Sequence, residues 1–63
     1  MKSSEEIKDL IVREIDSDGN LLKKLSAQFL SETNPVLKKA LETQISLTSY
    51  GMARLQSVLK EIE

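Results

Sequence analysis

The chain has 63 residues, 40% of them hydrophobic and 30% charged, with a formal net charge of −1 and neither histidine nor cysteine. These absences exclude imidazole bases, thiol nucleophiles, disulfide bonds and the usual zinc ligands, so we do not expect an enzyme or a bound metal or cofactor. With 3% aromatic residues, one Pro and two Gly, the composition is typical of a single all-α domain over residues 1–63.

A first helix should begin close to the N-terminus, where Ser3 and Glu6 have the spacing of a capping box. Apolar residues then recur every three or four positions, which is typical of one face of an α-helix. They are Ile7, Ile11, Ile15, Leu22, Leu25 and Phe29. This stripe keeps its phase through residues 17–20, although the Asp, Gly and Asn there often end a helix. We favour one helix over residues 4–30, bent near Gly19, and keep two shorter helices, broken there, as the alternative.

The middle of the chain predicts a turn and a second long helix. Asn34 suits the N-cap, and Pro35 suits the first helical position, where a missing N–H has no cost. An apolar seam in heptad spacing then runs nearly to the C-terminus. It consists of Leu41, Ile45, Thr48, Met52, Leu55, Leu59 and Ile62. Two helices of nearly equal length should fold back as an antiparallel hairpin, with Phe29 opposite Leu37 in the layer nearest the turn.

The central layer of this hairpin should be polar, because Asp18 falls opposite Thr48. Such a layer reduces stability but can select one register and one oligomeric state. Residues 16–20 are also similar to the start of an EF-hand calcium loop. The glycine and the bidentate glutamate that this loop requires are replaced by Leu21 and Ala27, so we favour a helix bend or a polar layer.

The second helix carries more apolar surface than one neighbouring helix can cover. Its apolar arc is widened beyond the seam by Leu37, Ala40, Leu47 and Val58. Tyr50 lies outside the seam and is a further candidate contact residue. In so short a chain, the burial of apolar surface stabilises the fold by about as much free energy as the ordering of the chain costs. We therefore expect a homo-oligomer, with a dimer that forms a four-helix bundle favoured, or a helical partner protein.

Four lysines flank the turn and are the candidate anion-binding residues. They are Lys23, Lys24, Lys38 and Lys39. Together with Glu32 they give residues 21–40 a net charge of +3, whereas residues 1–20 carry −3. A basic tip can contact phosphates, but lysines on helices are ordinarily solubilising, and no aromatic stacking platform accompanies these four. Nucleic acid is therefore an alternative partner and not the favoured one.

We expect a cytoplasmic location and no membrane association. No run approaches the roughly 18 apolar residues of a membrane span, and the N-terminal residues lack the pattern of a signal peptide.

The layout of the hairpin resembles the small needle and inner-rod subunits of type III secretion systems and their helical co-chaperones. The residues that carry this resemblance are Asn34, Pro35, Leu37, Gln44, Tyr50 and Lys60. It implies an assembly subunit, or a co-chaperone that keeps one helix face open for another chain. In length the hairpin also resembles the plasmid copy-number RNA-binding hairpin, which dimerises into a four-helix bundle, but the motif residues of that protein are missing. The leading hypothesis is a non-enzymatic interaction module that self-associates.

Overall fold

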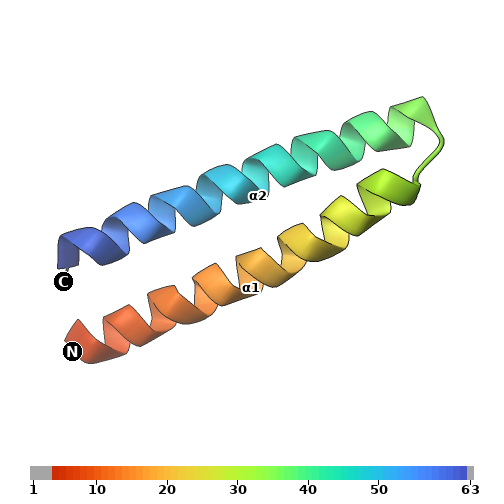
Figure 1. Cartoon of the computed structure of the whole chain (residues 1–63). Helices are drawn as coiled ribbons and strands as arrows, with labels where there is room; N and C mark the ends of the chain where they lie inside the picture. The colour runs from red at the N-terminus through yellow and green to blue at the C-terminus, as the bar shows by residue number, and fades with distance from the viewer. Residues whose placement is uncertain (1–3, 63) are drawn as a thin grey trace.

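The structure, a computed structural model, describes residues 4–62 and contains two α-helices, α1 (Ser4–Ser31) and α2 (Pro35–Ile62), joined by residues 32–34. The helices lie side by side and run in opposite directions, so the outer ends of both lie together and the turn lies at the far end (Figure 1). The predicted antiparallel hairpin is confirmed. The predicted cap at Ser3 lies outside the described residues.

Helix α1 passes through residues 17–20 without interruption. Helices that end at glycine commonly place it in the left-handed conformation, and no described residue, Gly19 included, has a positive φ. The alternative of two shorter helices is therefore wrong. Packing along the whole of α2 stabilises a continuous helix, and this outweighs the weak local preference of Asp, Gly and Asn for a turn.

The turn is organised by Asn34, whose side-chain Oδ1 accepts hydrogen bonds from the backbone N–H groups of Val36 at 2.9 Å and Leu37 at 3.2 Å. These N–H groups have no carbonyl partner within the helix, which is the need that an N-cap residue meets. The backbone N–H of Asn34 in turn donates to Oε1 of Glu32 at 3.0 Å. The predicted N-cap at Asn34 and the helix start at Pro35 are confirmed.

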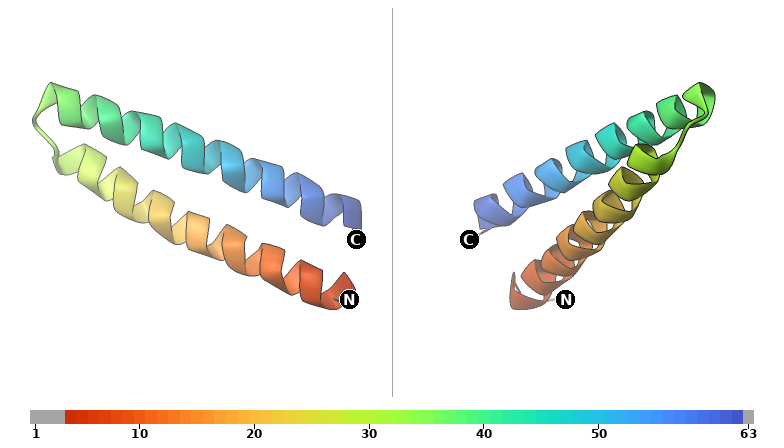
Figure 2. Two further views of the ribbon diagram at one scale, coloured as in Figure 1. Left: turned by 180° about the vertical axis from the view of Figure 1, so that it is seen from behind. Right: turned by 45° about the vertical axis from the view of Figure 1, so that its right-hand side comes forward.

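The two apolar stripes meet between the helices and are half-buried. The half-buried apolar side chains are Ile11, Ile15, Leu22, Leu25 and Phe29 on α1 and Leu41, Ile45, Met52, Leu55 and Leu59 on α2. Asp18 and Thr48 are half-buried at the centre of the same seam. No described residue is fully buried. Two helices form a single layer that is open on both faces (Figure 2), so no side chain is enclosed from every direction.

At the turn end the structure adds Lys38 to the predicted layer of Phe29 with Leu37. Leu37 is 53% exposed, and Nζ of Lys38 lies 4.4 Å from the centroid of the Phe29 ring. Leu37 and Lys38 fall on either side of the centre line of the seam, so the lysine can lay its methylene stem and ammonium group over the ring.

Candidate functional site

Exposed apolar side chains gather along one flank of α2. Leu37, Ala40, Leu47 and Val58 follow one another at intervals that return to the same side of a helix. Leu47 is 62% exposed and Val58 is 41% exposed. Gly51 lies on the same stripe, between Leu47 and Val58. This flank continues beside the seam and is not covered by α1.

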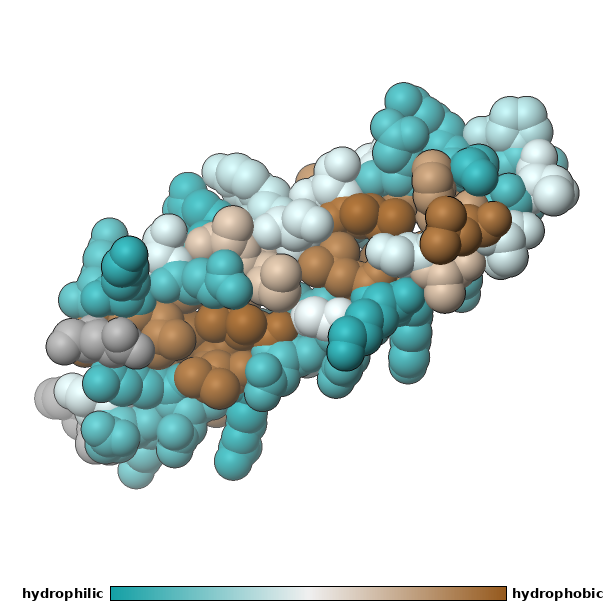
Figure 3. Space-filling model, in the orientation of Figure 1, coloured by the Kyte–Doolittle hydropathy of each residue, from teal (hydrophilic) through white to brown (hydrophobic). Residues whose placement is uncertain are grey.

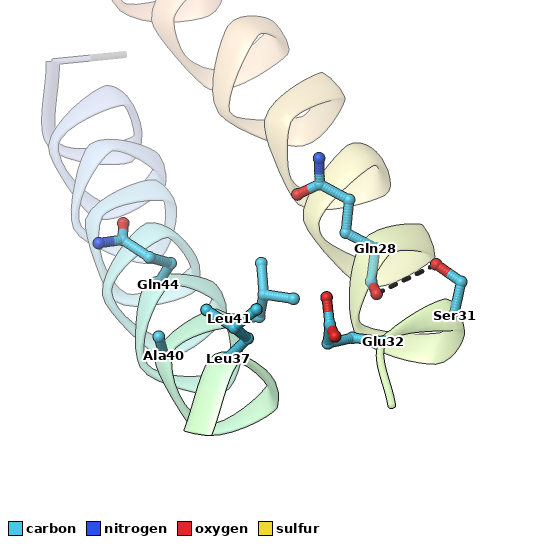
Figure 4. A pocket seen from close by; sticks show the side chains of 7 residues that line it. All are labelled: Gln28, Ser31, Glu32, Leu37, Ala40, Leu41 and Gln44. Atoms are coloured by element: carbon cyan, nitrogen blue, oxygen red, sulfur yellow. Dashed lines mark hydrogen bonds between the residues drawn. The ribbon is translucent and has the colours of Figure 1, made fainter. Parts of the chain in front are cut away.

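A hollow near the turn shows which side of α1 borders this flank. Its lining residues are Gln28 and Ser31 of α1, Glu32 of the turn, and Leu37, Ala40, Leu41 and Gln44 of α2 (Figure 4). Leu21 precedes Gln28 by seven residues, or two turns, and Leu10 precedes Leu21 by eleven, or three turns. Both exposed leucines therefore lie on the Gln28 side of α1. We call the combined surface the broad face; its residues are Leu10, Leu21, Leu37, Ala40, Leu47, Gly51 and Val58.

The opposite face of the hairpin is more polar. Gly19 lies nine residues before Gln28, which is half a revolution around α1, so it belongs to this second face. The hollow there is lined by Ile15, Asp16, Gly19, Asn20, Lys23 and Met52, which confirms the predicted neighbourhood of Ile15 and Met52. The large apolar side chains exposed on this side of α1 are Val12 and Leu30. The apolar surface is thus concentrated on the broad face.

The hydropathy of the surface shows how the apolar residues follow the seam. In the view of Figure 3, apolar side chains form a band between the two helices, with polar side chains along both outer edges. The band is interrupted near the middle of the rod by paler, less hydrophobic residues. Asp18 and Thr48 lie at the middle of the seam, and both glycines are close to them in sequence.

The hairpin exposes an unusually large area for its mass. Its accessible surface is 5023 Å² for 7.1 kDa. A folded monomer of this mass is expected to expose about 4,100 Å², roughly 900 Å² less. The molecule is a rod of 47 × 16 × 15 Å, in which both faces of the single layer of helices are open to solvent.

Tyr50 lies nine residues after Leu41 of the seam and therefore points away from α1. It is exposed, and the guanidinium carbon of Arg54 lies 6.0 Å from the centroid of its ring. Tyr50 is consequently outside the broad face, on the outer side of α2, while the other four candidate contact residues belong to the broad face.

The four candidate anion-binding lysines lie near the turn but differ in their surroundings. Lys39 pairs with Glu42 at 3.4 Å, and Lys38 covers the Phe29 ring. Lys23 lines the hollow of the opposite face, and Lys24 projects about 100° away from it around α1. Two of the four ammonium groups therefore already contact a neighbour within the chain, and the lysines do not share one face.

Residues 4–62 contain no group of three acidic side chains placed to hold a metal ion. Neither described helix has the length and apolar character needed to cross a membrane. No protein-family model, curated protein or solved structure matches this chain.

Proposed function

We propose that the chain is a non-enzymatic helical module that associates with a second copy of itself through the broad face. The observation that carries the proposal is the accessible surface of 5023 Å², which exceeds by roughly 900 Å² the area expected of a folded monomer. A specific interface of ordinary size buries about 800 Å² on each partner. One such contact would bring the chain to the exposure of an ordinary folded protein.

The choice of face follows from where the apolar side chains lie. The broad face carries exposed leucines from both helices, Leu10 and Leu21 on α1 and Leu37 and Leu47 on α2. Extended apolar surfaces of this kind mark interaction sites in soluble proteins. Stacking two hairpins on this face would enclose the half-buried seams between four helices, and a two-fold axis would close the assembly.

The test is the molar mass of the protein, measured by light scattering from low micromolar to millimolar concentration. We expect the mass to reach twice 7.1 kDa and to stop there. A needle-like subunit would instead give a mass that keeps rising, because a head-to-tail contact does not close. A mass of 7.1 kDa throughout the range would contradict self-association.

Two matched substitutions locate the contact. Leu47→Glu places a charge at the centre of the broad face, whereas Leu30→Glu places the same charge on an exposed leucine of the opposite face. We expect Leu47→Glu to be monomeric and Leu30→Glu to remain dimeric, because an unpaired charge is costly to bury and nearly neutral in water. Equal dissociation of both variants would show that the broad face is not the contact.

Salt dependence separates this proposal from nucleic-acid binding by the turn lysines. Phosphate contacts release counterions and weaken steeply as salt rises, whereas apolar contacts change little. We expect the dimer mass to be unchanged between low and high salt. A labelled RNA hairpin that binds at low salt and is released at high salt would support the alternative.

A further inference from the structure

We infer that the two copies pack in antiparallel orientation, with the turn end of one hairpin over the open end of the other and Leu47 of each copy over Gly51 of the other. This rests on the proposed self-association and adds the arrangement of the partner copy. Two arrangements keep the broad faces together under a two-fold axis. In the antiparallel one, α1 lies along α1 of the second copy and α2 along α2. In the parallel one, both turns lie at the same end and α1 lies along α2 of the second copy.

Charge favours the antiparallel arrangement. The turn end is basic, because four lysines and Glu32 give residues 21–40 a net charge of +3. The open end is acidic, because residues 4–17 of α1 carry a net charge of −3 and residues 49–62 of α2 carry +1. The parallel arrangement would bring the two basic ends together, whereas the antiparallel one lays each basic end over an acidic one. Complementary potentials of this kind select orientation.

Side-chain size along α2 favours the same arrangement. If the α2 helices of the two copies cross at residue 49, residues whose numbers add up to 98 lie opposite each other. Leu47 then faces Gly51 of the second copy, and Ala40 faces Val58. Each pair combines a larger side chain with a smaller one, which is how facing helices interdigitate.

Gly51 supplies the space that this pairing needs. A Cβ built on Gly51 meets nothing within 4 Å, so the surface above it is open in the single hairpin. Leu47 is 62% exposed and one turn away on the same stripe. In the antiparallel dimer the two residues would cover each other twice, once on each side of the axis. In the parallel dimer Gly51 would instead face the polar Glu14 and Ser17, which lie on the Gln28 side of α1.

The first experiment uses the two glycines as a matched pair. Gly19, on the opposite face, is open in the same sense, with nothing within 4 Å of an added Cβ. Gly51→Gln and Gly19→Gln therefore introduce the same flexible, helix-compatible side chain at positions where an added Cβ meets nothing within 4 Å. We expect Gly51→Gln to raise the dimer dissociation constant at least about tenfold, and Gly19→Gln to change it less than about threefold. Equal effects, or an intact dimer in Gly51→Gln, would overturn the contact.

The second experiment measures orientation directly. The chain has no cysteine, so Thr33→Cys in the exposed turn accepts a single spin label. In the antiparallel dimer the two labels lie at opposite ends, at a separation close to the 47 Å length of the rod. In the parallel dimer they lie about 10–20 Å apart, since packed helices are separated by about 10 Å.

The outcomes distinguish the inference from the function on which it rests. A dimeric mass with the long separation supports both. A dimeric mass with the short separation overturns the antiparallel arrangement and leaves self-association standing. A monomeric mass, with no interaction between labels, contradicts both the antiparallel arrangement and self-association.

Discussion

The polar layer at the centre of the seam offers the sharpest test of the packing. Asp18 is half-buried opposite the α2 seam, in a stripe that is otherwise apolar, and no described residue pairs with its carboxylate. Asp18→Leu replaces the carboxylate with a side chain that matches its neighbours. Because the site is only half-buried, the larger side chain can be accommodated without overpacking.

Two contributions set the expected size of the effect. Leucine is a better helix former than aspartate by about 0.5 kcal/mol. Burying a leucine fully is worth about 1.5–3 kcal/mol, so half-burial adds roughly 1 kcal/mol. We expect the free energy of unfolding to rise by about 1.5 kcal/mol, or roughly 6–12 °C in Tm for a domain of this size. The oligomeric state can change as well, since polar groups in apolar seams select register.

Thermal unfolding followed by circular dichroism, with the molar mass measured in parallel, provides the assay. Asp16→Leu is the matched control, because Asp16 lies on the same helix but is exposed and gains only the helix-propensity contribution. A lower Tm for Asp18→Leu would refute the placement of Asp18 in the seam. So would a rise no larger than that of Asp16→Leu.

Three further substitutions test other parts of the hairpin by thermal unfolding. Leu55→Ala should destabilise the fold by about 2–4 kcal/mol if dimerisation completes the burial of the half-buried seam. Lys39→Ala, which removes an exposed ion pair, should cost at most about 0.5 kcal/mol. Similar Tm shifts for the two variants would show that Leu55 does not lie in the seam. Asn34→Ala should destabilise by about 1 kcal/mol through loss of two capping hydrogen bonds, and an unchanged Tm would show that the cap contributes nothing. Gly19→Ala should stabilise the fold by about 0.5–1 kcal/mol, since Gly19 is helical and the space around an added Cβ is open. A lower Tm would mean that other atoms fill this space.

Much of the fold could be predicted from the sequence because each helix is marked locally. Asn34 and Pro35 define where α2 begins, through a side-chain acceptor and a residue with a fixed φ. The apolar stripe keeps the same angular phase on both sides of residues 17–20, which predicted that α1 continues, and the structure confirms it. Periodicity reports the angular position of a side chain around its own helix, and that information is contained in residue numbers alone.

The turn end could not be predicted to the same detail. Leu37 and Lys38 are both close to the seam line, and periodicity does not decide which of two neighbours covers Phe29. The structure places the lysine over the ring at 4.4 Å. The choice depends on the path of the chain through residues 32–34 and on the length of the lysine stem, which only the folded turn brings together.

Sequence alone therefore determined the two helices, their antiparallel pairing and the polar layer, because these follow from local capping and from apolar spacing along each helix. Tertiary structure decided which flanks of α1 and α2 share a face, and so that Leu10 and Leu21 lie on the same face as Leu47, whereas Tyr50 does not. The side on which two stripes join depends on how each helix is rotated about its own axis when the seam closes. That rotation is fixed by packing between residues distant in sequence, and it also determines how much apolar surface stays open to a second copy.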